Sequence, residues 1–257
     1  MSETDLGEAP AGAPGSSPSG LNRVAQALRE RWTGRDCFIV GVTGAVASGK
    51  STLSAALRAE LEAWPERPAV ELVCTDGFLH PNQALDALGL TARKGFPESY
   101  DTDALRRALE SVRLGPAVFP AYSHVAYDVD PALARRIDRP DVLIIEGLSL
   151  DLGGETAGDR LVDVLIYLDA EEQDIEHWFV QRFLGLWQAA EHDPTSFYAR
   201  FRGLDREQVA RVARTVWEQV NLPNLRDHIV KARGRADIIV RKRLDHGIDA
   251  VTGAAQP

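Results

Sequence analysis

The chain has 257 residues, a formal net charge of −9 and an apolar fraction of 44%. This length suits one α/β domain or two small ones, and the apolar fraction is sufficient for a buried core. Nonspecific binding to nucleic acid needs a basic face, which the acidic balance argues against. No apolar run reaches the roughly 18 residues of a membrane span, and the N-terminus lacks the basic and apolar regions of a signal peptide. We therefore expect a cytoplasmic protein without nucleic-acid or membrane partners.

Cysteine and lysine are both rare in this chain. The two cysteines, Cys37 and Cys74, lie in apolar, strand-like runs, so we expect buried free thiols in a reducing compartment. Most positive charge is carried by arginine, because lysine occurs only at positions 50, 94, 231 and 242. A lysine inside a glycine-rich motif therefore stands out from this background.

The ends of the chain differ in composition from its middle. Residues 1–20 are rich in glycine, proline, alanine and serine without periodicity, which is typical of a disordered tail. Residues 21–33 carry apolar side chains at helical spacing and predict a short amphipathic helix. We expect a single domain over residues 21–246 and a flexible tail over residues 247–257.

The stretch Gly44–Ser51 matches the pattern G-x-x-x-x-G-K-[ST]. An apolar run at residues 37–42, as long as a buried strand, precedes it, and leucines at helical spacing follow it. Strand, glycine-rich loop and helix in this order are the context of a P-loop. The alternative is a glycine-rich turn that binds nothing, and the flanking strand and helix argue against that alternative.

A P-loop binds phosphate for simple physical reasons. Glycines let successive backbone N–H groups point at phosphate oxygens, and the following helix adds the positive end of its dipole. Lys50 supplies a mobile charge for the β- and γ-phosphates, and Ser51 supplies a hydroxyl for Mg²⁺. We therefore expect a nucleoside triphosphate to be held by Gly44, Ala45, Val46, Ala47, Ser48, Gly49, Lys50, Ser51 and Thr52.

Strand and helix patterns alternate along the rest of the chain. Strands are expected over residues 70–74, 141–147, 161–168 and 236–240, and helices over residues 81–89, 102–112, 171–189, 194–203 and 205–220. Residues 115–140 are expected to be irregular. The alternation predicts an α/β fold, a P-loop NTPase-type three-layer sandwich with a mostly parallel central sheet flanked by helices.

Two acidic residues follow predicted strands directly. Asp76 comes after the second strand and Glu146 ends the third. Ligands of open parallel sheets gather beyond the carboxyl ends of the strands, so both acids are expected on the same edge as the P-loop. One can act as a base, and the other can join Ser51 in holding Mg²⁺ or its waters. A helix cap or a solvated turn is the alternative for each acid.

Phosphoryl transfer also needs positive charge on the moving group, and Arg182 lies in a helical pattern beside apolar residues. Its alternative is an arginine whose aliphatic stem packs along an apolar surface.

His124 between two tyrosines indicates a pocket for a small organic molecule. Asn221 follows a long helix and suits either that pocket or a helix C-cap. A further aromatic stripe is more typical of a core than of a ligand contact: Trp178, Phe179 and Phe183.

Several motifs besides the P-loop resemble the bacterial type I pantothenate kinases. They are Thr75–Asn82, Arg93–Asp101, Tyr122–His124, Ile145–Leu148, Arg182–Leu184, Asn221–Leu225 and Asp245–His246. The match runs in order from about residue 37 to residue 246 and is more specific than the P-loop alone. It implies a P-loop kinase fold, a homodimer, and transfer of the ATP γ-phosphate to the primary hydroxyl of pantothenate, which begins coenzyme A synthesis.

The resemblance also implies roles for single residues. Asp76 activates the pantothenate hydroxyl, Arg182 stabilises charge on the moving phosphoryl group, and His246 lies against the adenine. The pantothenate pocket is lined by Tyr122, His124, Tyr127, Phe179 and Asn221. Feedback inhibition by coenzyme A is a further property that the family implies.

Four positions depart from the family pattern. A tyrosine that contacts pantothenate is replaced by Phe179, and the positions associated with the pantothenate tail and coenzyme A carry Ala55, Leu186 and Glu191. The N-terminal region before the P-loop is also shorter. A related kinase for another small alcohol is therefore an alternative, and a nucleotide-dependent regulator without transfer activity is a second one. No Asn-Lys-x-Asp motif of a GTPase switch occurs in the chain.

Overall fold

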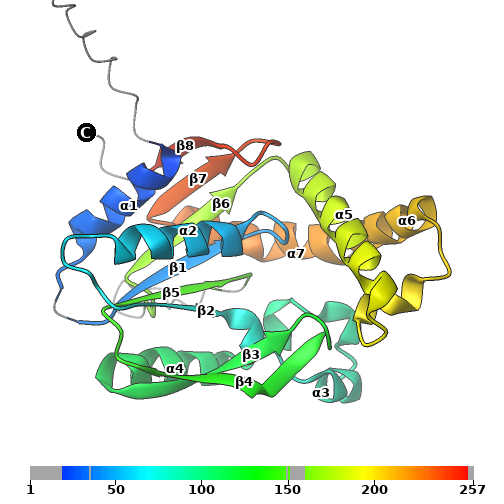
Figure 1. Ribbon diagram of the computed structural model, residues 1–257, viewed down its shortest axis with the longest axis horizontal. Helices are drawn as coiled ribbons and strands as arrows, with labels where there is room; N and C mark the ends of the chain where they lie inside the picture. Colours follow the sequence, from blue (N-terminus) through cyan, green and yellow to red (C-terminus); the bar gives the residue numbers. More distant parts are fainter. Residues whose placement is uncertain (1–18, 35, 149, 151–159, 254–257) are drawn as a thin grey trace, which may run out of the picture.

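The computed structural model describes residues 19–34, 36–148, 150 and 160–253 (Figure 1). The disordered tail expected at residues 1–20 lies almost entirely outside the described residues. The end of the tail expected at residues 247–257 lies outside them as well.

A six-stranded sheet with the order β2-β5-β1-β6-β7-β8 forms the centre of the molecule. Its strands are β1 (Phe38–Gly44), β2 (Val70–Cys74), β5 (Val142–Gly147), β6 (Val164–Asp169), β7 (Ile238–Lys242) and β8 (Ile248–Thr252). All neighbouring pairs are parallel except β7 with β8. All seven residues of β1 are buried, which explains its uninterrupted apolar sequence.

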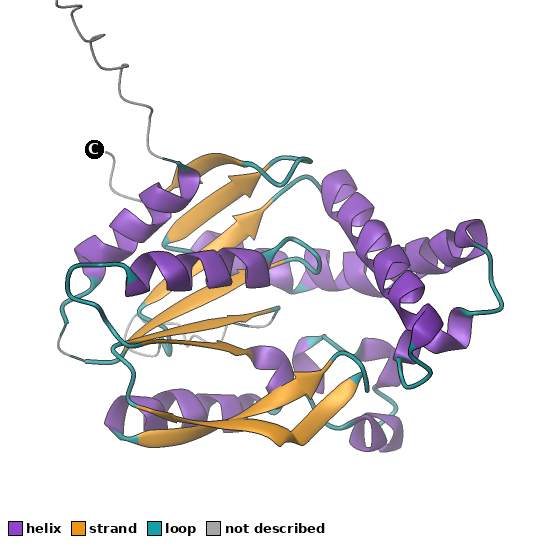
Figure 2. Ribbon diagram, viewed as in Figure 1, coloured by secondary structure: helices purple, strands orange, loops and turns teal. Residues whose placement is uncertain are grey.

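Helices lie on both faces of this sheet, which gives the three layers (Figures 1 and 2). The α-helices of the described residues are α1 (Gly20–Arg31), α2 (Lys50–Glu62), α3 (Asn82–Ala87), α4 (Thr102–Leu114), α5 (Glu172–Ala189), α6 (Arg206–Val216) and α7 (Leu222–Asp227), of which α3 and α6 lie outside these layers. The predicted α/β sandwich with a mostly parallel sheet is confirmed. No helix within the described residues is long and apolar enough to cross a membrane.

Successive residues of the central strands pack into two separate cores, one on each face of the sheet. Val40 and Val42 of β1 pack in one core with Leu57 of α2 and Leu28 of α1. Ile39 of the same strand packs in the other core, which also contains residues of α4, β3 and α5. This period of two is the geometry of a strand with both faces covered.

Residues 115–140 are not irregular, so that expectation is wrong. They form an antiparallel hairpin of β3 (Pro116–Ser123) and β4 (Asp128–Asp138) beside the central sheet (Figure 2). Most of β4 is exposed, so the strand lacks an apolar alternation. The register shifts between Phe119 and Ala121, around Pro120. Proline at an irregular position of a two-stranded sheet is compatible with pairing, although it weakens the strand signal.

The expected C-terminal tail is wrong for residues 248–252, which form the edge strand β8. The strand is held by α1 as well as by β7, because Arg23 Nη2 donates to the carbonyl oxygen of Val251 over 2.9 Å. A Cβ atom on Gly20 would lie 2.4 Å from Cγ2 of Ile248, so the helix and the strand are in close contact. This long-range support has no local sequence signal.

Candidate active site

The P-loop curls in the way that phosphate binding requires. Gly44, Ala47 and Gly49 all have positive φ angles, of 147°, 59° and 89°, and α2 begins directly after them at Lys50. A Cβ atom on Gly44 would lie 2.7 Å from the carbonyl oxygen of Leu168, so only glycine fits there. Backbone N–H groups and the N-terminus of α2 thus converge on one concave surface.

Lys50 is buried at the base of this loop. Its Nζ donates to the carbonyl oxygen of Ala45 over 2.9 Å. Burial lowers the pKa of Lys50, and the nearby carboxylates of Glu146 and Asp76 oppose that shift. A buried ammonium group facing two carboxylates is suited to a phosphate that brings further negative charge.

Ser51 and Glu146 form the candidate metal site. Ser51 Oγ donates to Glu146 Oε1 over 2.7 Å, and Glu146 is 8% exposed. The register places Glu146 beside Val42, just before the P-loop. No group of three or more His, Cys, Asp or Glu side chains within the described residues can hold a metal ion. This donor set fits Mg²⁺, which keeps waters and takes phosphate oxygens alongside one or two protein oxygens.

The P-loop also contains an unsatisfied polar atom. Ser48 is 1% exposed, and its Oγ has no hydrogen-bond partner within the described residues. Buried polar atoms normally have a partner, so an orphan in this position fits a polar ligand. The residues present therefore fit a nucleoside phosphate with its cation.

Asp76 lies in the 3₁₀ turn Thr75–Phe78, immediately after β2. One oxygen of its carboxylate, Oδ1, accepts a hydrogen bond of 3.1 Å from the hydroxyl of Tyr100. Both predicted strand-end acids therefore lie at the carboxyl edge of the sheet, and neither caps a helix.

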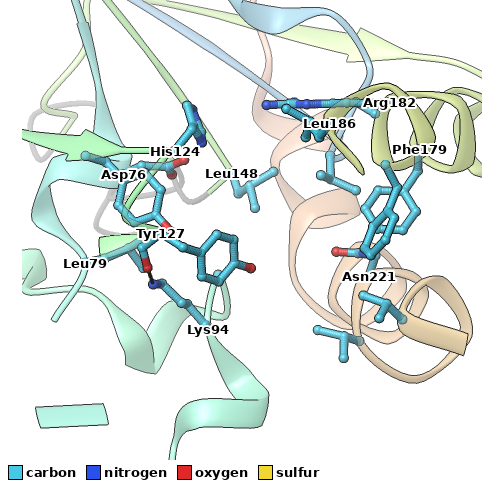
Figure 3. Close-up of a pocket in the computed structure, with 18 of the residues that line it drawn as sticks. Asp76, Leu79, Lys94, His124, Tyr127, Leu148, Phe179, Arg182, Leu186 and Asn221 are labelled. Carbon is cyan, nitrogen blue, oxygen red and sulfur yellow. Dashed lines mark hydrogen bonds between the residues drawn. The ribbon is translucent and has the colours of Figure 1, made fainter. Parts of the chain in front are cut away.

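A cavity of about 290 Å³ lies next to these acids. Figure 3 shows Asp76, His124 and Tyr127 on one side of it and Phe179, Arg182 and Asn221 on the other. The predicted residues that line it are Val46, Ala47, Lys50, Ser51, Asp76, Tyr122, His124, Tyr127, Glu146, Phe179, Arg182 and Asn221. The phosphate-binding, acidic and aromatic predictions thus come together in one cavity.

The β3–β4 turn supplies the aromatic groups of the first side. The Tyr122 ring lies edge-on to His124 at 5.2 Å and to Tyr127 at 6.0 Å. His124 is exposed and lines the cavity, yet partial burial lowers its pKa, and the charge of Arg182 adds to this effect. Burial raises the pKa values of both tyrosines, so they are neutral phenols at pH 7.

Helix α5 supplies the opposite side. Trp178 and Phe183 are buried, as expected for the aromatic stripe, but Phe183 also lines the cavity, together with the partly buried Phe179. Arg182 is exposed and lines the same cavity. It lines this cavity together with Lys50 and His124, and its charge adds to the lowering of their pKa values that burial causes.

Asn221 is not a helix C-cap, so that alternative is wrong. The chain continues from α6 through the π-helical turn Trp217–Asn221 directly into α7. The Nδ2 atom of Asn221 is buried without a partner within the described residues, and the residue lines the cavity. π-Helical turns frequently occur at functional sites. An unpaired amide donor in the cavity wall fits a polar substrate atom.

His246 lies outside the cavity but close to the P-loop. Its ring stacks on Trp178 with 4.4 Å between centroids and 23° between planes. Lys242 Nζ lies 3.5 Å from His246 Nδ1 and donates to the carbonyl oxygen of Ser48 over 2.8 Å. His246 is thus connected to the phosphate loop through Lys242, and its contact with adenine stays a prediction.

Two lysines at the site were not predicted as functional residues. Lys94 Nζ donates to Asn82 Oδ1 over 2.6 Å and to the carbonyl oxygen of Tyr127 over 2.7 Å, and it lines the cavity. Lys242 contacts the P-loop as described above. Lysine is rare in this chain, and three of the four lysines lie at this site. Their rarity was therefore the sequence signal that could have identified both residues.

Comparisons with family models and with curated proteins both identify a family of kinases. The Phosphoribulokinase / Uridine kinase family matches residues 39–183. A curated pantothenate kinase of Rhodopseudomonas palustris (strain TIE-1) is 44% identical over 224 residues, covering 83% of this chain and 70% of that protein. One of Myxococcus xanthus (strain DK1622) is 44% identical over 251 residues, covering 90% of this chain and 79% of that protein.

The fold has a solved counterpart as well. The crystal structure of a "putative fructose transport system kinase" from Silicibacter sp. TM1040 superposes with a TM-score of 0.65 and 27% identity, covering 84% of this chain and 95% of that one. The fold, the P-loop cavity and these relatives agree. The chain belongs to the Phosphoribulokinase / Uridine kinase family and, by its curated relatives, to the pantothenate kinases.

Proposed function

We propose that this P-loop kinase transfers the γ-phosphoryl group of ATP to the primary hydroxyl of pantothenate, forming 4′-phosphopantothenate. The observation that carries the proposal is the shared cavity. Lys50, Asp76 and Arg182 line it together with the aromatic groups of the β3–β4 turn. An alcohol bound among those aromatic groups is next to both a carboxylate and the phosphate loop.

Each side chain has one task in the proposed transfer. The substrate hydroxyl oxygen forms a bond to the γ-phosphorus, its proton passes to the Asp76 carboxylate, and the bond from that phosphorus to the bridging oxygen of ADP breaks. Lys50 and Arg182 stabilise the negative charge on the phosphoryl oxygens. Ser51 and Glu146 would hold Mg²⁺, which would supply neutralisation of phosphate charge.

Phe179 favours a second candidate, a related kinase for a different small alcohol. The cavity wall carries a phenyl ring where the resemblance implies a phenol. A lost hydrogen bond to substrate costs about 1 kcal/mol, which is enough to change the preference between related alcohols. The substrate panel below separates the two candidates.

A coupled ADP-release assay tests the proposal, with pantothenate and a panel of other alcohols and nucleosides as acceptors. We expect turnover with pantothenate and a product that carries the new phosphate on the primary hydroxyl in ³¹P NMR. Turnover with another alcohol, and none above background with pantothenate, would contradict the pantothenate assignment. Asp76→Asn is the matched control, because removal of a positioned base should lower kcat by about 10²-fold while ATP still binds.

The homodimer, the requirement for Mg²⁺, the cytoplasmic location and control by coenzyme A belong to the same proposal. Ala55 is exposed on α2 and offers no charge to a coenzyme A phosphate, so we expect weak inhibition. Light scattering tests the homodimer, and removal of Mg²⁺ with EDTA tests the metal requirement. Cell fractionation tests the location, and inhibition curves with coenzyme A test its control.

A further inference from the structure

The cavity contains a phenol that the sequence patterns did not single out. Tyr198 lies on the 3₁₀ turn Phe197–Phe201, beyond the end of α5, and lines the same cavity as Phe179. We propose that Tyr198 provides the substrate hydrogen bond that Phe179 lacks, so that the hydroxyl has moved from α5 to this turn. The inference rests on the proposed function and makes Tyr198 a specificity-determining residue.

The two rings occupy neighbouring places in the cavity wall. Tyr198 lies edge-on to Phe183 with 5.1 Å between centroids, and Phe179 lies edge-on to the same ring at 6.2 Å. Both rings therefore pack against Phe183 in the wall of one cavity. A hydroxyl on either side chain therefore belongs to the wall of the same substrate cavity, as a relocated hydroxyl requires.

The turn that carries Tyr198 is fixed against the opposite side of the cavity. Phe197 stacks on Tyr127 with 4.1 Å between centroids and 23° between planes, and the Phe197 N–H donates to the carbonyl oxygen of Val125 over 3.2 Å. Ser196 caps the turn by accepting a hydrogen bond from the Tyr198 N–H. A hydroxyl on such a support is positioned before substrate arrives, which reduces the entropy cost of binding.

The Tyr198 hydroxyl is available to a ligand. Within the described residues it makes no hydrogen bond, whereas the hydroxyl of Tyr100 is already bonded to Asp76. The Tyr198 side chain is partly buried, and burial raises its pKa to about 12, with a smaller contribution from Tyr127. It is therefore a neutral phenol at pH 7, able to donate to a carbonyl oxygen or to accept from a hydroxyl group.

The surroundings of Tyr198 describe the part of the substrate that it contacts. The cavity is lined by several apolar residues besides Tyr198: Phe179, Phe183, Leu186, Phe201, Val216 and Val220. A phenol in such a wall, together with the polar groups of Arg182 and Asn221, selects a substrate portion with an amide or hydroxyl oxygen on a largely apolar body. Such a site discriminates strongly against an analogue without that oxygen, because the phenol would remain unpaired.

Four proteins test the proposal: the wild type, Tyr198→Phe, Phe179→Tyr and the double variant. Tyr198→Phe keeps the ring and its packing, so its melting temperature should match that of the wild type. We expect its KM for pantothenate to rise by about 5- to 10-fold, with kcat and the KM for ATP within about twofold. Phe179→Tyr should restore the pantothenate KM in the Tyr198→Phe background.

The outcomes separate this inference from the function on which it rests. An unchanged pantothenate KM in Tyr198→Phe, with an active wild type, overturns the inference and leaves the proposed function intact. A wild type that phosphorylates another alcohol overturns the pantothenate assignment, and the same four proteins then test Tyr198 with that alcohol. A wild type that phosphorylates no alcohol of the panel overturns both.

Discussion

The hydroxyl of Tyr100 donates to Oδ1 of Asp76 over 3.1 Å, and its side chain is almost fully enclosed, with 4% of the residue exposed. Backbone hydrogen bonds also connect the segment around Asp76 with the segment around Tyr100. Asp101 N–H donates to the carbonyl oxygen of Phe78, and His80 N–H donates to that of Ser99, each over 2.8 Å. The carboxylate is therefore held by a phenol that has little freedom of its own, which makes Tyr100 a positioning residue for Asp76.

Removal of this hydroxyl should slow catalysis without weakening nucleotide binding. We predict that Tyr100→Phe lowers kcat by about 10-fold, because a misaligned base loses part of its 10²- to 10⁴-fold contribution, while the KM for ATP stays constant. Steady-state kinetics of Tyr100→Phe, Asp76→Asn and the double variant check this. The Tyr100 change should have little effect once Asp76 is absent. If the double variant lost kcat by the product of the two single losses, Tyr100 would act independently of Asp76, and the prediction would be wrong.

The sequence predicted Asp76 but not its partner, and the reason is physical. A strand followed by an acid is a local pattern, and the parallel sheet then determines on which edge that acid lies. The contact with Tyr100 depends on a loop that returns 24 residues later, and no local preference encodes such a return. Asn221 was predicted for the pocket but with a helix C-cap as the alternative, because a helical pattern does not reveal where a π-helical turn interrupts it.

Lys242 links the last parallel strand to the P-loop, through its hydrogen bond to Ser48 and its position over the Trp178 ring at 5.4 Å. Hydrogen bonds of charged groups contribute about 1.5 to 3 kcal/mol. We therefore predict that Lys242→Met raises the KM for ATP by about 10-fold and changes the KM for pantothenate little. Direct binding of a fluorescent ADP analogue provides the second measurement.

Lys231→Met is the matched control for that variant. Lys231 is exposed and does not line the cavity, so its replacement removes the same charge without touching the P-loop. Equal effects of the two substitutions on the KM for ATP would mean that only net charge matters.

Gly77 is the point where the turn that carries Asp76 contacts β3. A Cβ atom at this position would lie 2.0 Å from the carbonyl oxygen of Pro120, and backbone atoms cannot move away as a flexible side chain can. We predict that Gly77→Ala lowers the free energy of unfolding by about 1 to 3 kcal/mol and reduces kcat as well. Urea denaturation followed by circular dichroism measures the first effect.

Gly185→Ala provides the opposite result for comparison. This glycine lies in α5, and an added Cβ atom there meets nothing within 4 Å. Alanine should stabilise the helix by about 0.5 to 1 kcal/mol. A Gly77→Ala protein as stable as Gly185→Ala would show that the turn and β3 are not packed as described.

The two free thiols should be unreactive in the folded protein. Burial raises the pKa of Cys37 to about 11 and the pKa of Cys74 well above its ordinary value of 9.0. The reactive species is the thiolate, and a raised pKa means that the thiol keeps its proton at pH 8. We predict slow modification by Ellman's reagent at pH 8 and two rapid equivalents after denaturation. A fast equivalent in the native protein, assigned with Cys37→Ser, would contradict this prediction.

The expectations that failed concern segments whose stability comes from distant parts of the chain. Strand β4 is exposed along most of its length, and β8 has one buried residue, Val251. Neither strand shows the apolar alternation that identifies a half-buried strand. By contrast, β1 and β5 are buried at every position. Their sequences therefore carried enough information to predict the centre of the sheet and the P-loop edge.

The lysine distribution has a chemical consequence. Burial lowers the pKa values of Lys50, Lys94 and Lys242, and a lysine with a lowered pKa has more free amine to attack an electrophile. Acylating or reductive-methylating reagents will therefore find most of their side-chain targets in a single place. A bound nucleotide would shield Lys50 and Lys242 at the P-loop, so a chemical treatment usually regarded as a surface modification becomes an active-site label for this enzyme.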